Sequence, residues 1–291
     1  MPAAALLAVL LAGQSPAPAG GLGAEAEKVK ARRLLELHAG DAAGYAIYRD
    51  PARTQKLELR REPVYRWTNP TRVGGQTGDV FVWTDRGRPE VVASIFSHPA
   101  EGHQRIVCHE LHSLSRAVLV VDRPGPNQWV PRAPGVDLKP IPGATTPAGS
   151  APARLAQLRT LAREFAGRSL SDKGQAWELR LLTRPLYRYE STDPDVLDGA
   201  MFALVSSAGT DPEIVLLLEA RDDGGGPRWD YGAARCSDMD LWLTHKGQEV
   251  WSAIRGGENT FYHDALHRFR FFQDRFIPEI EGVEIPAASR P

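Results

Sequence analysis

A stretch of sequence that begins at residue 57 returns in the second half of the chain, and this repetition constrains the fold more than any other feature. Residues 57–60 and 63–67 read LELR and PVYRW, while residues 177–180 and 185–189 read WELR and PLYRY. The spacing is 178 − 58 = 120 between the glutamates and 187 − 65 = 122 between the first tyrosines. Such near-constant spacing predicts tandem copies of one structural unit.

Further blocks keep the same order and a similar spacing. Convergent strand patterning could imitate one block, but five blocks in order favour a duplication. The additional matches are GDVF at 78–81 with GAMF at 199–202 (199 − 78 = 121), PEVV at 89–92 with PEIV at 212–215 (212 − 89 = 123), and Trp129 with Trp251 (251 − 129 = 122). The predicted organisation is repeat 1 over 23–142, a linker over 143–149 and repeat 2 over 150–291.

Each copy is predicted to be one helix followed by a series of strands. Alternation of apolar and charged residues at 57–59 and 177–181 is typical of half-exposed strands. Nearly continuous apolar runs indicate strands covered on both faces, at 80–83, 91–96, 117–121 and 214–218. The turns between strands are too short for crossover helices, so neighbouring strands should be antiparallel. We expect an α+β fold, predominantly antiparallel β, with two tandem helix-plus-meander repeats packed as a pseudo-dimer.

The helix of the second copy has the clearer pattern. Ser150 and Pro152 are typical of a helix start, and Gly167 is a suitable stop. Between them one apolar stripe is formed by Leu155, Leu158, Leu161, Ala162 and Phe165. Residues 25–38 give a weaker helical pattern in the first copy. Residues 136–141 are predicted as an edge strand that resembles 276–278, which would place an insertion near 256–267 in the second copy.

The N-terminus predicts export. Residues 3–12 are apolar but too short to span a bilayer, and Ala17-Pro18-Ala19 fits a small-x-small cleavage site. Residues 1–22 are therefore predicted to be a signal peptide, although the segment before the apolar run has no Lys or Arg; the alternative is an apolar, disordered N-terminus. No later stretch is apolar enough for a transmembrane segment. In an exported chain, Cys108 and Cys236 could form a disulfide or remain buried thiols.

The charge balance argues against nucleic acid as a partner. The chain has 35 Lys and Arg against 36 Asp and Glu, for a formal net charge of −1. Without a basic excess there is no general field that would attract a polyanion. The sequence also lacks the G-x-S-x-G, H-E-x-x-H, P-loop and C-x-x-C motifs. No particular cofactor is indicated.

Half of the histidines of the chain fall in one fifteen-residue stretch. Together with a cysteine and a glutamate they are a candidate zinc site, because imidazole, thiolate and carboxylate are the usual zinc ligands. The candidate metal ligands are His98, His103, Cys108, His109, Glu110 and His112. On a strand, Cys108, Glu110 and His112 share one face and His109 points to the other. The favoured alternative is a set of solvated and hydrogen-bonded strand histidines.

The repeated Tyr-Arg-aromatic segments are candidate ligand-binding strands. Two aromatic platforms could line a shared groove and stack on a sugar, base or lipid head. The candidate residues are Tyr65, Arg66, Trp67, Tyr187, Arg188 and Tyr189. The simpler interpretation is core aromatics with a surface arginine. Two weaker candidates are a helical pair with an aspartate (His263, Asp264, His267) and a calcium site (Asp193, Asp195, Asp198, Asp222, Asp223), which is more simply a set of solvated turn carboxylates.

Several blocks resemble a family of exported bacterial proteins, especially from planctomycetes. The blocks are PVYRWTNP at 63–70, FVWT at 81–84, PLYRY at 185–189 and LDGAMF at 197–202. The resemblance implies export and the two-copy layout, but no activity, substrate or catalytic residue. The leading hypothesis is a non-catalytic binding protein of the periplasm or cell exterior, with a groove between the repeats for a small molecule or envelope component. The alternatives are a metal-assisted hydrolase that uses the His98–His112 region and a structural component of the envelope.

Overall fold

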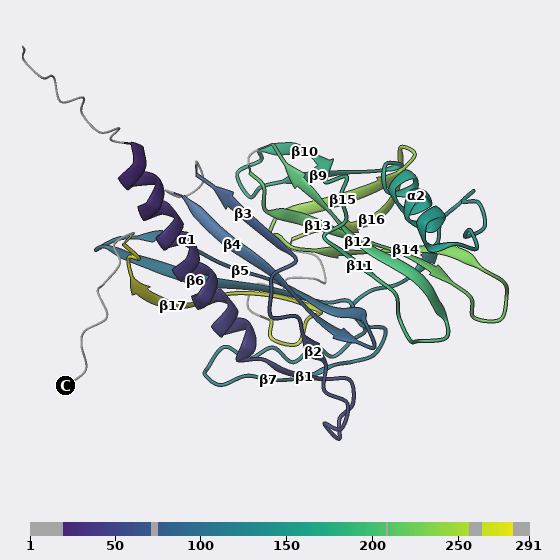
Figure 1. The fold of residues 1–291 in the computed structure, drawn as a ribbon, viewed down its shortest axis with the longest axis horizontal. Helices are drawn as coiled ribbons and strands as arrows, with labels where there is room; N and C mark the ends of the chain where they lie inside the picture. The colour runs from purple at the N-terminus through teal and green to yellow at the C-terminus, as the bar shows by residue number, and fades with distance from the viewer. Residues whose placement is uncertain (1–19, 71–74, 208, 256–263, 282–291) are drawn as a thin grey trace, which may run out of the picture.

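The computed structural model describes residues 20–70, 75–207, 209–255 and 264–281 (Figure 1). The predicted signal peptide lies outside the described residues up to residue 19, and so does the part of the predicted insertion at 256–263, with His263. The strands outnumber the helices, and every strand pair is antiparallel. The α+β class dominated by antiparallel sheet is therefore confirmed.

The elements fall into two runs that each begin with a helix. The first run is α1 (Gly20–Ala43), β1 (Ala46–Tyr48), β2 (Glu58–Leu59), β3 (Tyr65–Asn69), β4 (Gln76–Asp85), β5 (Arg88–Ala100), β6 (Gln104–Ser113), β7 (Val120–Asp122) and β8 (Lys139–Pro140). The second run is α2 (Ala151–Ala162), β9 (Phe165–Leu170), β10 (Ala176–Leu181), β11 (Tyr187–Tyr189), β12 (Val196–Ser206), β13 (Pro212–Arg221), β14 (Arg228–Arg235), β15 (Asp240–His245), β16 (Gln248–Ala253) and β17 (Phe269–Pro278).

These strands build two large sheets. The first sheet has the order β17-β6-β5-β4-β2, and β3 also pairs with β4. The second sheet has the order β16-β15-β9-β10-β12-β13-β14-β8, and β11 also pairs with β12. Strands β1 and β7 form a separate two-stranded sheet. Both large sheets thus contain a central meander, β4-β5-β6 in the first and β12-β13-β14 in the second.

The last strand of each run pairs with the sheet of the other run. Strand β8 follows the first meander but pairs with β14 of the second sheet. Strand β17 follows the second meander but pairs with β6 of the first sheet. The predicted edge strand at 136–141 is realised as the short β8, and Ile141 continues the pairing through its amide to the Trp229 carbonyl at 2.8 Å. The chain therefore passes from one sheet to the other twice, once before β8 and once before β17.

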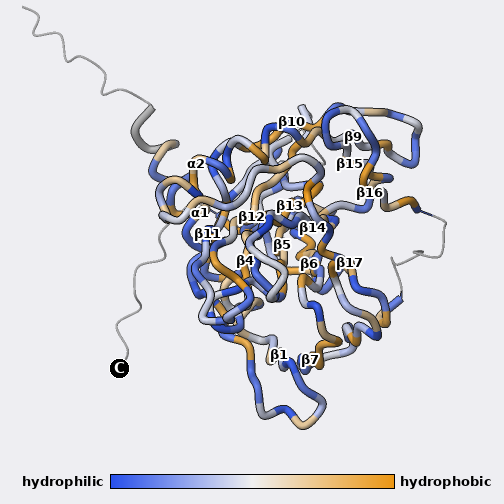
Figure 2. Tube along the Cα trace, turned by 90° about the vertical axis from the view of Figure 1, so that its right-hand side faces the viewer, coloured by the Kyte–Doolittle hydropathy of each residue, from blue (hydrophilic) through white to orange (hydrophobic). Residues whose placement is uncertain are grey.

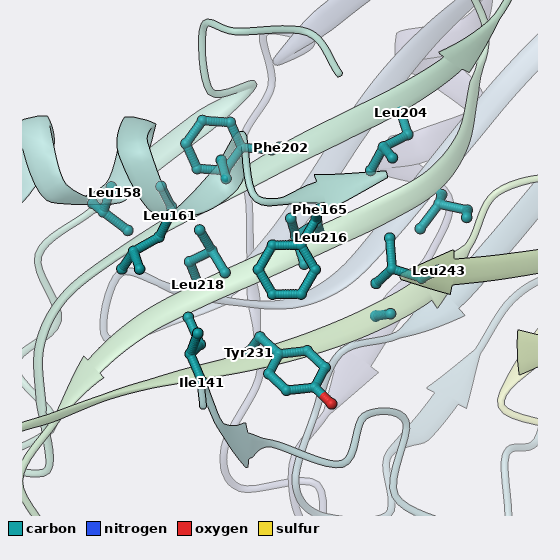
Figure 3. Packing of buried hydrophobic residues seen from close by; sticks show 14 of the residues in the cluster. Ile141, Leu158, Leu161, Phe165, Phe202, Leu204, Leu216, Leu218, Tyr231 and Leu243 are labelled. Atoms are coloured by element: carbon teal, nitrogen blue, oxygen red, sulfur yellow. The ribbon is translucent and has the colours of Figure 1, made fainter. Parts of the chain in front are cut away.

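Alternate side chains of the meanders are buried on opposite faces, which explains the continuous apolar runs. Val80, Val82 and Val92 of the first sheet share a buried cluster with Met201 and Leu217 of the second sheet. The other faces pack against the helices: the end of α1 packs on the first sheet and α2 packs on the second. Figure 3 shows Leu158 and Leu161 of α2 beside Phe202, Leu216 and Leu218. Figure 2 shows apolar stretches along the central strands.

Three details differ from the sequence-based expectations. Helix α2 ends at Ala162, and Phe165 begins β9 instead of extending the helical stripe. Gly167 lies in β9, where a Cβ atom would sit 3.1 Å from Leu204 and 3.2 Å from Ile214, so close packing explains the glycine and a helix stop does not. The predicted buried strand at 117–121 is wrong in extent: β7 is short, and Val118 is 44% exposed.

Candidate functional site

The arginines of the two Tyr-Arg-aromatic segments attach the helices to the sheets. Arg66 on β3 donates from Nε to the Asp79 carboxylate at 2.7 Å and from Nη2 to the Ala31 carbonyl of α1 at 3.0 Å. On β11, Arg188 Nη2 lies 2.7 Å from the Asp198 carboxylate and 2.9 Å from the Ala151 carbonyl of α2. Both aspartates are fully buried. A buried carboxylate requires a charged partner, so these arginines stabilise the buried aspartates and thereby the contact between helix and sheet.

A second residue from each helix completes the same arrangement. His38 on α1 lies with Nδ1 2.7 Å from Asp79, and both side chains are fully buried. Arg154 on α2 donates from Nε to Asp198 at 3.0 Å. Each buried carboxylate therefore binds one side chain from its helix and one from the neighbouring short strand.

The first tyrosines of the two segments reach between the runs of the chain. Tyr65 donates its hydroxyl to the Thr210 carbonyl at 3.1 Å, in the turn between β12 and β13. Tyr187 donates to the Gly87 carbonyl at 3.0 Å, in the turn between β4 and β5. The two contacts are reciprocal: each tyrosine holds the hairpin turn of the other meander.

The remaining aromatic residues of these segments are buried between the sheets. Trp67 and Tyr189 are 4% and 3% exposed and belong to the cluster that both sheets share. Each covers a glycine on the adjacent strand, because a Cβ atom on Gly78 or Gly199 would lie 2.4 Å or 2.3 Å from its ring. The six predicted ligand-binding residues thus all make contacts within the framework, and ligand binding by them stays a prediction. Tyr65 and Arg66 also line a cavity of about 600 Å³ formed with residues 182–186.

A buried ionic network joins the sheets near the Tyr189 end of the shared cluster. Arg88 donates from Nε to Glu219 and from Nη1 to Glu90, both at 2.8 Å. Tyr189 and Arg221 also bind Glu219, at 2.6 Å and 3.1 Å. Burial alone would lower the pKa of Arg88, but the attraction of Glu219 and Glu90 is larger, so the pKa is raised. Burial raises the Glu219 pKa, but Arg88, Tyr189 and Arg221 outweigh it and keep the carboxylate ionised.

The predicted metal ligands are divided among four places. Within the described residues, His98, Cys108 and Glu110 line a cavity of about 130 Å³. His103 is an exposed turn residue with φ = 56°. His109 faces α1, as the strand alternation predicted, with Nδ1 2.6 Å from the Tyr45 hydroxyl and Nε2 3.6 Å from Asp41. In the described part of the chain, no three His, Cys, Asp or Glu side chains are placed to hold a metal ion.

The two cysteines are free and buried. Burial raises the Cys108 pKa to about 12, and burial also raises the pKa of Cys236. The thiols are therefore protonated at neutral pH and behave as small apolar core residues.

The predicted calcium-site aspartates mostly bind arginines or turn amides. Asp198 binds Arg188 and Arg154, and Asp223 binds Arg228 at 2.6 Å. Asp193 lies 3.5 Å from Arg86, and Asp195 lies 3.9 Å from Arg221. Asp222 accepts from the amides of Gly224 and Gly226 at 3.1 Å and 3.2 Å. The contacts of Asp193, Asp195, Asp222 and Asp223 fit the simpler interpretation of turn carboxylates, whereas Asp198 is fully buried on β12.

A cavity lined by both polar and aromatic side chains lies where the first sheet, the segment leading to β8 and the second sheet meet. We call this cavity of about 220 Å³ the junction cavity. Its wall comes from five segments of the chain: His112, Gly135, Asp137, Lys139, Tyr231, Ala233, Arg235, Val250, Trp251, Ser252, Ala253, His267 and Arg268. Strand pairing sets Lys139 directly opposite Tyr231.

Close backbone contacts fix the segments around this cavity. Gly135 donates its amide to the Ser115 carbonyl at 2.8 Å, and a Cβ atom on Gly135 would lie 1.8 Å from the Ser113 carbonyl oxygen. Only glycine allows this approach. On the other side, the Trp129 Nε1 donates to the His267 carbonyl at 2.9 Å. The cavity is therefore shaped by the framework and does not depend on one loop.

The charges around the junction cavity are mainly positive. Lys139, Arg235 and Arg268 face one carboxylate, Asp137. Burial lowers the pKa of His112 to about 3, so this histidine is neutral at pH 7. Its Nε2 lies 3.3 Å from the Gly135 carbonyl, which places the proton on Nε2. Burial also lowers the pKa of His267.

Sequence reasoning identified only part of this site. It selected His112 as a candidate metal ligand and His267 as part of a weaker candidate cluster, and it used Trp251 only as a repeat marker. It did not select Lys139, Arg235 or Arg268. No linear motif could have found them, because the wall residues converge only when β8 pairs with β14 and residues 267–268 run beside β6.

None of the described helices combines the length and apolar character that crossing a membrane requires. The resemblance to exported bacterial proteins stays a prediction. Searches for similar proteins find no matching family model, no matching curated protein and no matching solved structure, so function must be argued from the residues of the junction cavity.

Proposed function

We propose that the two runs of the chain are copies of one helix-plus-meander unit, packed as a pseudo-dimer. Support comes from contacts that recur at corresponding positions. Tyr65 binds the carbonyl of Thr210, and Tyr187 binds that of Gly87. The tyrosines are 187 − 65 = 122 residues apart and the carbonyls 210 − 87 = 123 apart, close to the spacing of the sequence blocks. The crossed pairing of β8 and β17 supports the same interpretation.

We further propose that the protein is an exported, non-catalytic binding protein whose ligand occupies the junction cavity. The observation that carries this proposal is the cavity itself, which combines an aromatic wall with convergent polar groups between the two sheets. Its volume of about 220 Å³ is below the roughly 300–1,000 Å³ of drug-sized sites. A small metabolite is therefore the expected ligand. Non-catalytic binding also agrees with the structural use of the repeated tyrosines and arginines.

The proposal is tested by blocking the cavity. A panel of sugars, sugar phosphates, amino acids and organic acids is screened by thermal shift against the wild-type protein. Any compound that binds the native state raises the melting temperature by an amount that grows with the logarithm of its concentration over its Kd. We expect at least one hit, and we expect the Ala253→Phe variant to lose it, because Ala253 is a buried part of the cavity wall.

The matched control is Ala176→Phe, at an exposed position on β10 that is not part of the cavity wall. This control should retain every hit of the wild type. Hits that survive in Ala253→Phe, measured on protein with native circular dichroism, would place the binding elsewhere. A panel without any hit would remove the support for a binding function.

A further inference from the structure

We infer that the ligand of the junction cavity is a small organic anion, a carboxylate or phosphate ester, that carries a ring or sugar. This inference rests on the proposed binding function and adds the chemical class of the ligand. It comes from three properties of the wall: its excess of cationic groups, its aromatic side, and the opposition of its one carboxylate by Arg268 while its buried histidine binds the framework.

The first property is the charge of the wall. Lys139 and Arg268, the two cations of the wall that are not fully buried, stand against one carboxylate in a chain whose formal net charge is −1. The third cation, Arg235, is 1% exposed and donates to the carbonyls of Ser237 and Met239. The carboxylate, Asp137, is 75% exposed at its side chain and lies 3.6 Å from Arg268. An exposed pair at this distance contributes little and is readily replaced by a ligand anion. Among the described residues, no carboxylate lies within ion-pair distance of Lys139.

Arg268 is well placed to bind a carboxylate or phosphate. Its Nη1 lies 3.3 Å from the Gly135 carbonyl, which fixes one side of the guanidinium at the cavity wall. Its side chain is 34% exposed, so it is not sealed in the core. A planar guanidinium suits bidentate binding of these anions, and charge-assisted hydrogen bonds are stronger than neutral ones.

The second property is the aromatic side of the wall. Trp251 is partly buried against the core of the second sheet and lines the cavity. Tyr231 also lines it, and Figure 3 shows the Tyr231 hydroxyl at the outer end of its ring, away from the apolar cluster. A ring or sugar face packs well on an indole, while a phenolic hydroxyl can bind a ligand oxygen. A simple inorganic anion would leave this apolar surface uncovered.

The third property excludes a cation as the favoured occupant. His112 has its Nε2 3.3 Å from the Gly135 carbonyl, so this nitrogen is used by the framework and is not offered to a metal ion or other cation. The one carboxylate, Asp137, is opposed by Arg268. A cationic ligand would therefore meet net repulsion from the wall.

The test compares four probes by isothermal titration calorimetry: glucose 6-phosphate, gluconate, inorganic phosphate and glucose. We expect one of the two organic anions to bind at least about tenfold more tightly than both glucose and inorganic phosphate, since one charge-assisted contact is worth about that factor. The comparison of gluconate with glucose 6-phosphate separates a carboxylate from a phosphate ligand. Binding should weaken as NaCl is raised from low to physiological concentrations.

Two variants assign the binding to named side chains. Lys139→Gln removes an exposed charge at a strand pairing that uses only the backbone, and Arg268→Gln removes the guanidinium. Each should weaken the preferred organic anion about tenfold and leave glucose unchanged. The matched controls, Lys173→Gln and Arg159→Gln, alter exposed residues outside the cavity wall and should have no effect. Circular dichroism confirms folding, and Lys139→Gln serves as the deciding variant if Arg268→Gln is unstable.

The outcomes separate this inference from the proposed function. If glucose or another neutral compound binds as tightly as the anions and is lost in Ala253→Phe, the anion inference is overturned while the binding cavity stands. If anion binding is unchanged in Lys139→Gln, the assignment to this wall is also overturned. If no probe and no panel compound binds, both proposals fail.

Discussion

The two meanders share several framework contacts, yet their buried surfaces differ at matching positions. Both attach a helix through an arginine and a buried aspartate, and both hold the turn of the other meander through a tyrosine hydroxyl. Between the sheets, however, Phe96 of the first meander corresponds to Glu219 of the second, at 219 − 96 = 123. Trp67 packs on Phe96 with ring centroids 5.4 Å apart, while Tyr189 donates to Glu219. One end of the shared core is thus aromatic and the other ionic.

The tryptophans at matching positions of the two runs also have different surroundings. Trp129 is 1% exposed and holds the His267 carbonyl, whereas Trp251 lines the junction cavity. The same residue type serves the framework in one run and faces an open space in the other. Features present in both runs therefore point to folding, while features present in only one run are the better guide to function.

The largest expected effect tests the ionic end of the shared core. Arg88→Met leaves Glu219 and Glu90 buried without their main cation, so we expect the free energy of unfolding to fall by about 3–5 kcal/mol. Chemical denaturation measures the loss. The matched control is Arg86→Met, which removes two part-exposed pairs, with Asp85 and Asp193, and should cost less than about 1 kcal/mol.

A double variant sharpens this prediction. Combining Arg88→Met with Glu219→Gln should recover part of the lost stability, because the uncompensated charge is removed together with its partner. If Arg88→Met costs no more than Arg86→Met, the ionic network does not stabilise the contact between the sheets. In that case the two ends of the shared core would be energetically alike despite their different chemistry.

The second prediction concerns acid stability, where the first sheet differs from the second. His109 and His112 on β6 correspond to Tyr231 and Ala234 on β14, at 231 − 109 = 122 and 234 − 112 = 122. Burial lowers the pKa of both histidines, to about 3 for His112. The folded state therefore stays neutral at these sites while the unfolded chain takes up protons below about pH 6.5. The contribution of these histidines to the free energy of unfolding should be fully present above that pH and should decrease as the pH falls.

Between pH 6.5 and 4.5 the loss from His112 alone should be about 2 kcal/mol, since each pH unit contributes about 1.4 kcal/mol once the unfolded histidine is protonated. Carboxylates with lowered pKa values, such as Glu219, lose their contribution only at lower pH. His112→Gln should flatten the pH dependence of unfolding in this window. The exposed His103→Gln should leave the slope unchanged. Equal slopes in the wild type and His112→Gln would contradict the burial argument.

The sequence predicted the class of fold because the apolar runs and short turns are local signals. Runs such as 91–96 identified the strands buried on both faces, and the alternation at 108–112 placed His109 opposite Cys108. The helix end was missed because a glycine suits both a helix stop and a tightly packed strand. Gly167 takes the second role only because Leu204 and Ile214 lie beside it, which is a tertiary contact.

The candidate site was less predictable than the fold. Sequence analysis favoured residues that recur or cluster. The recurring Tyr65 and Tyr187 make framework contacts, and the clustered histidines are divided among β5, a turn and opposite faces of β6. In the sequence, the cationic residues of the junction cavity neither recur in both runs nor lie close to one another. Lys139 and Arg268 are 268 − 139 = 129 residues apart, and the exchange of β8 and β17 between the sheets brings their segments together.

The smallest expected effect tests whether the two reciprocal tyrosine contacts are equivalent. Tyr65→Phe and Tyr187→Phe each remove one hydroxyl that donates to a turn carbonyl, at 3.1 Å and 3.0 Å, and leave the rings in place. Each should lower the free energy of unfolding by about 1 kcal/mol, the usual net value of such a hydrogen bond. The double variant should lose the sum to within about 0.5 kcal/mol, because the two sites share no partner. A large loss from one variant and none from the other would show that only one meander depends on the turn of its neighbour. The recurring contacts would then no longer support a symmetric pairing of two equivalent units.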